Sequence, residues 1–427
     1  MGTNTTGHFY ECTLGEGVHF RSIRDERFKT QRISVNMMVP LDRQTAAANA
    51  LLPAMLARAN RAYPDYTRLG QRLSELYGAS LTGSVHKQGD IQVLSLTTVG
   101  IADRYALEGE KISAELTGLL CASVFEPVLD ENGLLPEEDF LQEQRQTLEL
   151  LESELNDKMQ YARRRATELL LEGEPAALSR CGTMEEVQQL TREEVTAAWR
   201  EVLQKAVIEI MVLGDCSPEP VLETVRQRLP QNRQPLSCRS EVYPASGTVR
   251  EKTESMDVQQ YKMILGFRSG LPAGEKTPAL KLMSAVLGGT PHSKLFQNVR
   301  EKLSLCYYCS AQYNIGKGIL LIESGVEGKN LEKAREEILR QLEEIREGHI
   351  TQEELDSAKM SVANGMRTVE DYLGSTENWY LTQTFRPQIL TPEEFARQIE
   401  GVTAEEVQEA AKACVLDAVY VMKGLEE

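Results

Sequence analysis

The chain has 427 residues, of which 41% are hydrophobic and 26% charged, a composition that is ordinary for a globular protein of two or three domains. Its longest apolar runs, such as IEIMVL at 208–213, have the length of strands and fall well short of the roughly 20 residues that span a bilayer. The net charge of −17 disfavours a general nucleic-acid binder or a binder of anionic membranes, but it does not exclude peptide ligands.

Eight cysteines are scattered along the chain, at positions 12, 121, 181, 216, 238, 306, 309 and 414. This density is too low for a disulfide framework, and it favours a reducing compartment. The N-terminal residues MGTNTTGHFYECTL carry no basic patch followed by an apolar block, so we expect no signal peptide. The sequence therefore predicts a cytoplasmic protein.

The first half of the chain predicts strands alternating with helices. We expect a strand at 32–41, helices at 46–59 and 66–77, strands at 80–86 and 91–98, a helix at 105–120, and helical structure with a break over 137–171. A T-x-x-E capping box at Thr191 opens the last helix of this half, and a closing strand follows it.

The second half predicts the same order of elements. We expect, in chain order, a strand at 260–267, helices at 277–287 and 292–302, strands at 307–313 and 318–324, and helices at 331–347 and 352–373. A second capping box, at Thr403, precedes the last helix and the closing strand. Residues 229–256 hold three prolines and many polar residues, which is typical of a linker. We therefore expect domains at 1–228 and 257–427.

Two sequence matches indicate that the halves are copies of one fold. LTREEV at 190–195 matches VTAEEV at 402–407, and LGQRLSE at 69–75 parallels LFQNVRE at 295–301. The matches occur in the same order, at offsets of 212 and 226 residues, about half the chain length. Strands and helices are mixed along the chain, and neighbouring strands are close in sequence. The predicted class is therefore α+β, with two tandem homologous domains that each pack helices on a mostly antiparallel sheet.

The sequence gives no local support for a catalytic centre. The five histidines, at 8, 19, 86, 292 and 349, form no H-x-x-x-H or H-x-x-E-H pair that would place two zinc ligands on one helix face. Cys306 and Cys309 form a C-x-x-C in a strand pattern, where residues three apart point to opposite faces, so we interpret them as buried structural thiols. The segment GGTPHSKL at 288–295 lacks the second glycine of a phosphate loop and predicts a connection between helices.

Arg300 and Tyr307 are candidate binding residues, at the end of a predicted helix and the start of a predicted strand. A guanidinium and a phenol that converge there could bind a carbonyl or a carboxylate. On spacing alone the other interpretation is favoured, in which Arg300 complements the helix dipole and Tyr307 is an ordinary sheet aromatic.

A longer stretch carries a family resemblance. LGGTPHSKLFQNVREKLSLCYYCSAQY, at 287–313, resembles the C-terminal-domain signature of the insulinase/pitrilysin family of zinc peptidases, which includes the mitochondrial processing peptidases. Residues 170–199 and 351–385 resemble other segments of that family, so that the resemblance covers nearly the whole chain. It implies tandem domains, each with helices packed on a mostly antiparallel sheet.

The resemblance also implies that the zinc site of the family is lost. The H-x-x-E-H motif falls on ALLPA, with Ala50 and Ala54 at the histidine positions and Pro53 at the position of the general base. Alanine offers no lone pair to a metal, and proline has no carboxylate to take a proton from a zinc-bound water. The third ligand of the family would be one of the glutamates 143, 149 or 152. We expect no peptidase activity, no bound metal and no cofactor.

The pair of residues with which the family holds substrate falls on Arg300 and Tyr307. The resemblance thus implies an accessory subunit that binds peptide substrate for an active zinc-peptidase partner carrying an intact H-x-x-E-H motif, in a heterodimer. The alternative is a stand-alone peptide-binding or scaffold protein, possibly homodimeric. The match is to a bacterial subgroup of catalytically silent members, some of which are named for association with the aminopentanol modification of elongation factor P.

Overall fold

A computed structural model of the chain describes residues 4–6, 9–386 and 388–425, and divides it into two compact units. Unit 1 comprises residues 1–152, 178–239 and 373–385, and unit 2 comprises residues 153–177, 240–372 and 386–427. Each unit therefore takes its largest part from one half of the chain and one short segment from the other half.

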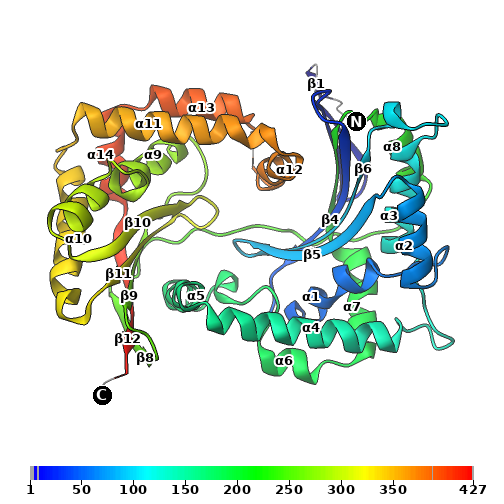
Figure 1. The fold of residues 1–427 in the computed structure, drawn as a ribbon, viewed down its shortest axis with the longest axis horizontal. Helices are drawn as coiled ribbons and strands as arrows, with labels where there is room; N and C mark the ends of the chain where they lie inside the picture. The colour runs from blue at the N-terminus through cyan, green and yellow to red at the C-terminus, as the bar shows by residue number, and fades with distance from the viewer. Residues whose placement is uncertain (1–3, 7–8, 387, 426–427) are drawn as a thin grey trace. The chain divides into compact units, whose positions relative to one another are not determined.

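Unit 1 is built on a seven-stranded sheet (Figure 1). In spatial order its strands are β1 (Asn4–Thr6), β2 (Phe9–Gly15), β3 (Val18–Arg24), β7 (Val207–Gly214), β4 (Thr30–Pro40), β6 (Ile91–Ile101) and β5 (Ser80–Gln88). Only the pairing of β3 with β7 is parallel among these described strands. The strand β5 forms one edge of the sheet.

Helices cover one face of this sheet and bury the main core of the unit. They are α1 (Ala46–Leu56), α2 (Tyr66–Glu75), α3 (Ile112–Phe125), the first part of α4 (Glu137–Asn156), α6 (Met184–Gln189), α7 (Arg192–Lys205) and α8 (Pro218–Arg226). The core includes Ile33, Val35 and Met37 of β4. Because side chains alternate along a strand, Ser34 and Asn36 lie on the opposite face. There the helix α12 (Leu373–Leu381) packs against β4 and β7.

Unit 2 repeats the topology of unit 1. Its strands are, in spatial order, β10 (Cys306–Asn314), β11 (Ile319–Val326), β9 (Tyr261–Arg268), β12 (Val415–Gly424) and β8 (Arg250–Met256). Read from the edge, the order β10-β11-β9-β12-β8 matches the order β5-β6-β4-β7-β3 in unit 1, and the last pair is parallel in both. The α+β class with two homologous domains is therefore confirmed, and the duplication is visible strand by strand.

The helices of unit 2 are α9 (Thr277–Gly288), a π-helix (Leu295–Lys302), α10 (Leu331–Arg346), α11 (Gln352–Arg367), α13 (Pro392–Gly401) and α14 (Ala404–Ala413). A further helix, α5 (Lys158–Leu170), comes from the first half of the chain and packs on β9 and β12. Ala162 and Ala166 of α5 form an apolar cluster with Ile264, Tyr420 and Met422. The helix α5 thus packs on the sheet of unit 2, as α12 packs on the sheet of unit 1.

Several local predictions are confirmed and others need correction. Both predicted capping boxes form, at Thr191 with Glu194 and at Thr403 with Glu406. The helix expected at 105–120 is wrong in its bounds, because residues 103–105 form a 3-10 turn and α3 begins only at Ile112. The helix expected at 352–373 ends at Arg367. Residues 250–256, inside the expected linker, form β8.

The predicted geometry of the two cysteines of the C-x-x-C is also wrong. Cys306 and Cys309 are both buried, although the simple alternation of a strand would place them on opposite faces. The reason is a β-bulge in β10, between Cys306 and Tyr308, which inserts one extra residue and restores both thiols to one face.

Candidate functional site

The positions to which the resemblance assigns the zinc motif, Ala50, Pro53 and Ala54, lie in the middle of α1, which is buried along almost its whole length. Ala50 is 8% exposed and Pro53 is buried inside the helix, while Ala54 is half-buried. Proline lacks the N–H that would continue the helical ladder. None of these three side chains carries an atom that can coordinate a metal or accept a proton.

The edge strand β5 lies directly against this part of α1. A Cβ atom built on Gly83 of β5 would fall 2.0 Å from the carbonyl oxygen of Pro53 and 2.7 Å from the backbone nitrogen of Ala54. Only glycine permits this approach of strand and helix backbones. The space beside Pro53 and Ala54 is thus filled by the backbone of β5.

The structure distinguishes the three glutamates that could supply a third zinc ligand. Glu149 and Glu152 are exposed, whereas Glu143 on α4 is 5% exposed. The guanidinium of Arg58, which follows α1, donates to Asp139 at 2.7 Å, to Gln142 at 2.9 Å and to Glu143 at 3.3 Å. Burial raises the pKa of Glu143, and the Arg58 charge opposes that shift. Arg58 is therefore a cationic partner of this carboxylate.

Arg300 and Tyr307 are both accessible, at the end of the π-helix and near the start of β10. The Arg300 side chain is 41% exposed, stacks over the Phe296 ring at 4.6 Å and lies 3.6 Å from a carboxylate oxygen of Glu301. Tyr307 is 54% exposed, and its hydroxyl donates to Glu327 at 3.1 Å. The two side chains thus present donors to solvent, each held by its own neighbours.

The segment that superficially resembles a phosphate loop is a connection between helices. Gly288 ends α9, and the Ser293 hydroxyl donates to the carbonyl oxygen of Thr290 at 2.6 Å. The Lys294 ammonium is buried and pairs with Glu354 at 3.0 Å. Because this lysine is already neutralised, the segment offers no cation to a phosphate.

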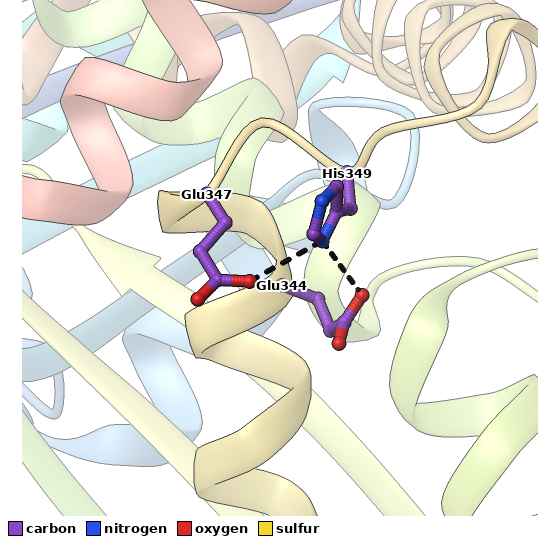
Figure 2. Close-up of side chains that lie close together, drawn as sticks. All are labelled: Glu344, Glu347 and His349. Atoms are coloured by element: carbon purple, nitrogen blue, oxygen red, sulfur yellow. Dashed lines mark hydrogen bonds and ion pairs between the residues drawn. The ribbon is translucent and has the colours of Figure 1, made fainter.

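One group of potential metal ligands among the described residues lies at the end of α10 (Figure 2). His349 Nδ1 lies 3.1 Å from a carboxylate oxygen of Glu344 and 3.4 Å from one of Glu347. A pattern of paired histidines does not reveal this group, because its other members are carboxylates five and two residues before His349. The same nitrogen faces both carboxylates and the group is largely exposed, an arrangement that suits a surface ion pair.

Sequence patterns also missed a polar network that α12 covers in unit 1. The carboxylate of Glu377 on α12 accepts hydrogen bonds from Arg32 and from Ser34. The guanidinium of Arg21 donates to the hydroxyl of Thr384 at 3.2 Å. Beneath them Glu209 of β7 is fully buried, 3.3 Å from Arg21. Burial raises the pKa of Glu209 to about 7, the Arg21 charge opposes the shift, and the Glu11 charge adds to it. The pairs in this network are 188 to 363 positions apart in the chain, so no local motif could reveal it.

Comparisons with known proteins agree with this picture. The family model described as the inactive domain of M16 peptidases matches residues 189–362. A probable inactive metalloprotease of Bacillus subtilis, YmfF, is 29% identical over 415 residues, which is 96% of this chain and 96% of that protein.

Solved structures have the same fold. A conserved protein of Enterococcus faecalis superimposes with a TM-score of 0.91 at 29% identity, over 99% of this chain and 100% of the other. An M16 peptidase inactive-domain protein of Pseudomonas fluorescens does so with a TM-score of 0.78 at 19% identity, over 98% of each chain. The chain is therefore similar to inactive members of the M16 peptidases, and its residues Ala50, Pro53 and Ala54 carry no side-chain group that binds a metal.

Proposed function

We propose that this protein is an accessory subunit that helps to bind peptide substrate for an active zinc-peptidase partner. The observation that carries the proposal is a contrast between the two units. In unit 1 the metal positions hold Ala50, Pro53 and Ala54, whereas in unit 2 Arg300 and Tyr307 remain as exposed donors beside the edge strand β10.

The chemistry of the exposed pair suits a peptide. A guanidinium offers several N–H donors in a planar fork, and a phenol adds one O–H donor, so together they can hold a peptide carbonyl or a carboxylate. The neighbours of the pair, Glu301 and Glu327, are themselves carboxylates that a substrate oxygen could replace. Such exchange costs little, because the Arg300–Glu301 ion pair and the Tyr307–Glu327 hydrogen bond are both exposed to water.

The partner of the proposal carries the intact H-x-x-E-H motif and supplies the zinc. The net charge of −17 argues against nucleic acid and anionic membrane as partners. Among the residues that the structure describes, no helix combines the length and the apolarity that crossing a membrane requires. We place the complex in the cytoplasm, on the strength of its sparse cysteines. The link to elongation factor P stays a prediction.

Capture of the chain from its native cell extract, with crosslinking, tests the proposal. We expect a homologue of similar size that carries H-x-x-E-H to be recovered in near-stoichiometric amount. Recovery of the chain alone, or only with copies of itself, would contradict the accessory role and favour the stand-alone peptide-binding scaffold.

The captured complex then allows a test of the substrate-binding pair. We expect Arg300→Ala to reduce cleavage of peptides while leaving assembly intact, because the guanidinium contacts substrate and not the core. Arg340→Ala is the matched control, since Arg340 is also an exposed helical arginine of unit 2 that pairs with nearby glutamates. Equal activity of both variants and the wild type would refute the role of Arg300.

A further inference from the structure

The β-bulge in β10 changes the relation between Cys306 and Cys309. Along the neighbouring strand β11, Cys306 lies opposite Val326, Tyr308 opposite Gly325 and Cys309 opposite Ser324. Tyr307 has no counterpart and is the extra residue. Because Val326 and Ser324 are two residues apart, the two cysteines take the spacing of alternate residues in a regular strand and share one face.

This spacing brings the thiols within reach of each other. Alternate residues of an antiparallel strand are about 6.8 Å apart, and disulfides join Cα atoms separated by up to about 6.8 Å. The thiols of Cys306 and Cys309 hydrogen-bond to each other and to Ser324. The Cβ atoms of a disulfide are only about 3.5–4.5 Å apart, so the strand must bend locally before the bond forms, and a disulfide that keeps such strain is readily reduced again.

The two thiols are chemically unequal. The hydrogen bond from Cys309 lowers the pKa of Cys306 in spite of burial, and the nearby charge of Arg300 acts in the same direction. By contrast, burial raises the pKa of the isolated thiols of Cys121 and Cys414 to about 12. Thiolates are the reactive form of cysteine. Cys306 is therefore suited to attack first and Cys309 to resolve the product.

The position of the pair allows access by a small oxidant. Both side chains are buried, at 8% and 7% exposure, but β10 is the edge strand of its sheet and pairs only with β11 among the described strands. The segment just before it contains Ser304, whose backbone has a positive φ of 50°. An edge strand can separate locally at less cost than a central one, because only one ladder of hydrogen bonds breaks.

We propose that Cys306 and Cys309 form a reversible intramolecular disulfide, a redox modification site in the edge strand of unit 2. Glutathione disulfide serves as the oxidant. The Cys306 thiolate attacks one sulfur of glutathione disulfide, which breaks its S–S bond and releases one glutathione thiolate. Cys309 then loses its proton to water and attacks the Cys306 sulfur, which releases the second glutathione. Two protein thiols are oxidised, and one glutathione disulfide is reduced to two thiols.

Formation of the disulfide acts on the segment between the cysteines. Tyr307 lies inside the loop that the disulfide closes, and its hydroxyl donates to Glu327. The neighbouring Tyr308 is held by packing of its ring over Gly325, where an added Cβ would fall 2.3 Å from the ring. We therefore expect oxidation to move the exposed Tyr307 more than the anchored Tyr308. The disulfide itself does not depend on the accessory role proposed above.

Mass spectrometry of the whole chain tests the proposal. The protein is incubated with glutathione disulfide, denatured, alkylated and digested. We expect the peptide that contains both cysteines to lose two hydrogens and to lose both alkylation sites, and excess reduced glutathione to restore them. In Cys309→Ser, which lacks the resolving thiol, we expect a persistent glutathione adduct on Cys306. Cys12→Ser removes a lone, half-buried thiol of unit 1 and serves as the control, with disulfide formation unchanged.

Two results would overturn the proposal. The first is full alkylation of both cysteines in samples where Cys12 has acquired glutathione, since the oxidant is then competent and the pair does not respond. The second is the same glutathione adduct on Cys306 in the wild type and in Cys309→Ser, since the second thiol then resolves nothing. The first measurement uses the wild type alone, so a folding defect in a variant leaves the test intact.

Discussion

We expect Glu209→Gln to abolish a pH-dependent loss of stability in unit 1. Glu209 is fully buried in the central part of the sheet, and neither of its carboxylate oxygens accepts a hydrogen bond, because its 3.3 Å contact with Arg21 lacks the geometry of one. Burial consequently raises its pKa to about 7, from an ordinary value of 4.5. A glutamine at this position cannot titrate.

The sign and size of the effect follow from this shift. Because the folded state holds the proton more tightly than the unfolded state, the contribution of Glu209 to stability is complete below about pH 4.5. It declines as the pH rises through the window from 4.5 to about 7 and is constant above it. One pH unit corresponds to about 1.4 kcal/mol, so the shift predicts a decline of about 3 kcal/mol in the free energy of unfolding.

Tryptophan fluorescence can follow this unit alone. The chain has two tryptophans, Trp199 and Trp379, and both belong to unit 1. We would measure denaturant unfolding of the wild type and of Glu209→Gln from pH 4.5 to 8, and compare the free energies at each pH. Between pH 4.5 and about 7, the free energy of unfolding of the variant should rise by about 3 kcal/mol relative to that of the wild type. Glu75→Gln, at a 65% exposed side chain of α2, should leave the slope unchanged.

A flat difference between wild type and Glu209→Gln across this range would refute the reasoning, since Glu209 would then have the same pKa in the folded and the unfolded chain. A difference that moves in favour of the wild type as the pH rises would also refute it. That result would mean that Arg21 stabilises the ionised carboxylate by more than burial destabilises it.

Three further outcomes are expected. Gly83→Ala should lower the stability of unit 1 by about 1–3 kcal/mol in denaturant unfolding, because its Cβ would meet the backbone of α1, and an unchanged midpoint would contradict that packing. The triple change Ala50→His, Pro53→Glu and Ala54→His should give no zinc-dependent peptide cleavage, because β5 fills the adjoining space, and zinc-dependent turnover by that variant would contradict this. Glu254→Gln should loosen α5 in hydrogen exchange at neutral pH. Burial opposes the low pKa of Glu254, but hydrogen bonds from Arg165 and other donors outweigh burial and lower this pKa to about 2. The stabilisation that the ionised carboxylate provides is therefore lost as the pH falls from 4.5 towards 2. At that low pH the variant should match the wild type.

The parts of the fold that depend on local pattern were predictable. The β4 and β9 strands, the helices α1 and α9 and both capping boxes follow from periodicity and from residue types near in sequence. The duplication followed from two short matches and is visible in the shared strand order. The sequence resemblance alone singled out Ala50, Pro53 and Ala54, and the structure places all three in the buried helix α1.

The remaining features depend on contacts that sequence pattern does not encode. The bulge at Tyr307 reverses the expected facing of Cys306 and Cys309, and nothing in CYYC distinguishes a bulged strand from a regular one. The approach of Gly83 to α1 and the pairing of Arg58 with Glu143 join residues far apart in the chain. The sequences of β7 and β4 do not show that their polar residues form a buried network, because the helix that covers them, α12, comes from the other half of the chain.

The crossing of α5 and α12 to the units of the opposite halves bears on how the chain folds as it is made. Unit 1 has all of its strands once Gly214 has been synthesised, yet α12 begins only at Leu373. At 5–20 residues per second, the intervening residues take on the order of 10 s to emerge. During that delay the face that carries Ser34, Asn36 and Glu209 has no helix over it. Docking of α12 is therefore a late step in the folding of unit 1. The helix α5, by contrast, is synthesised before β9 and β12, the strands on which it packs.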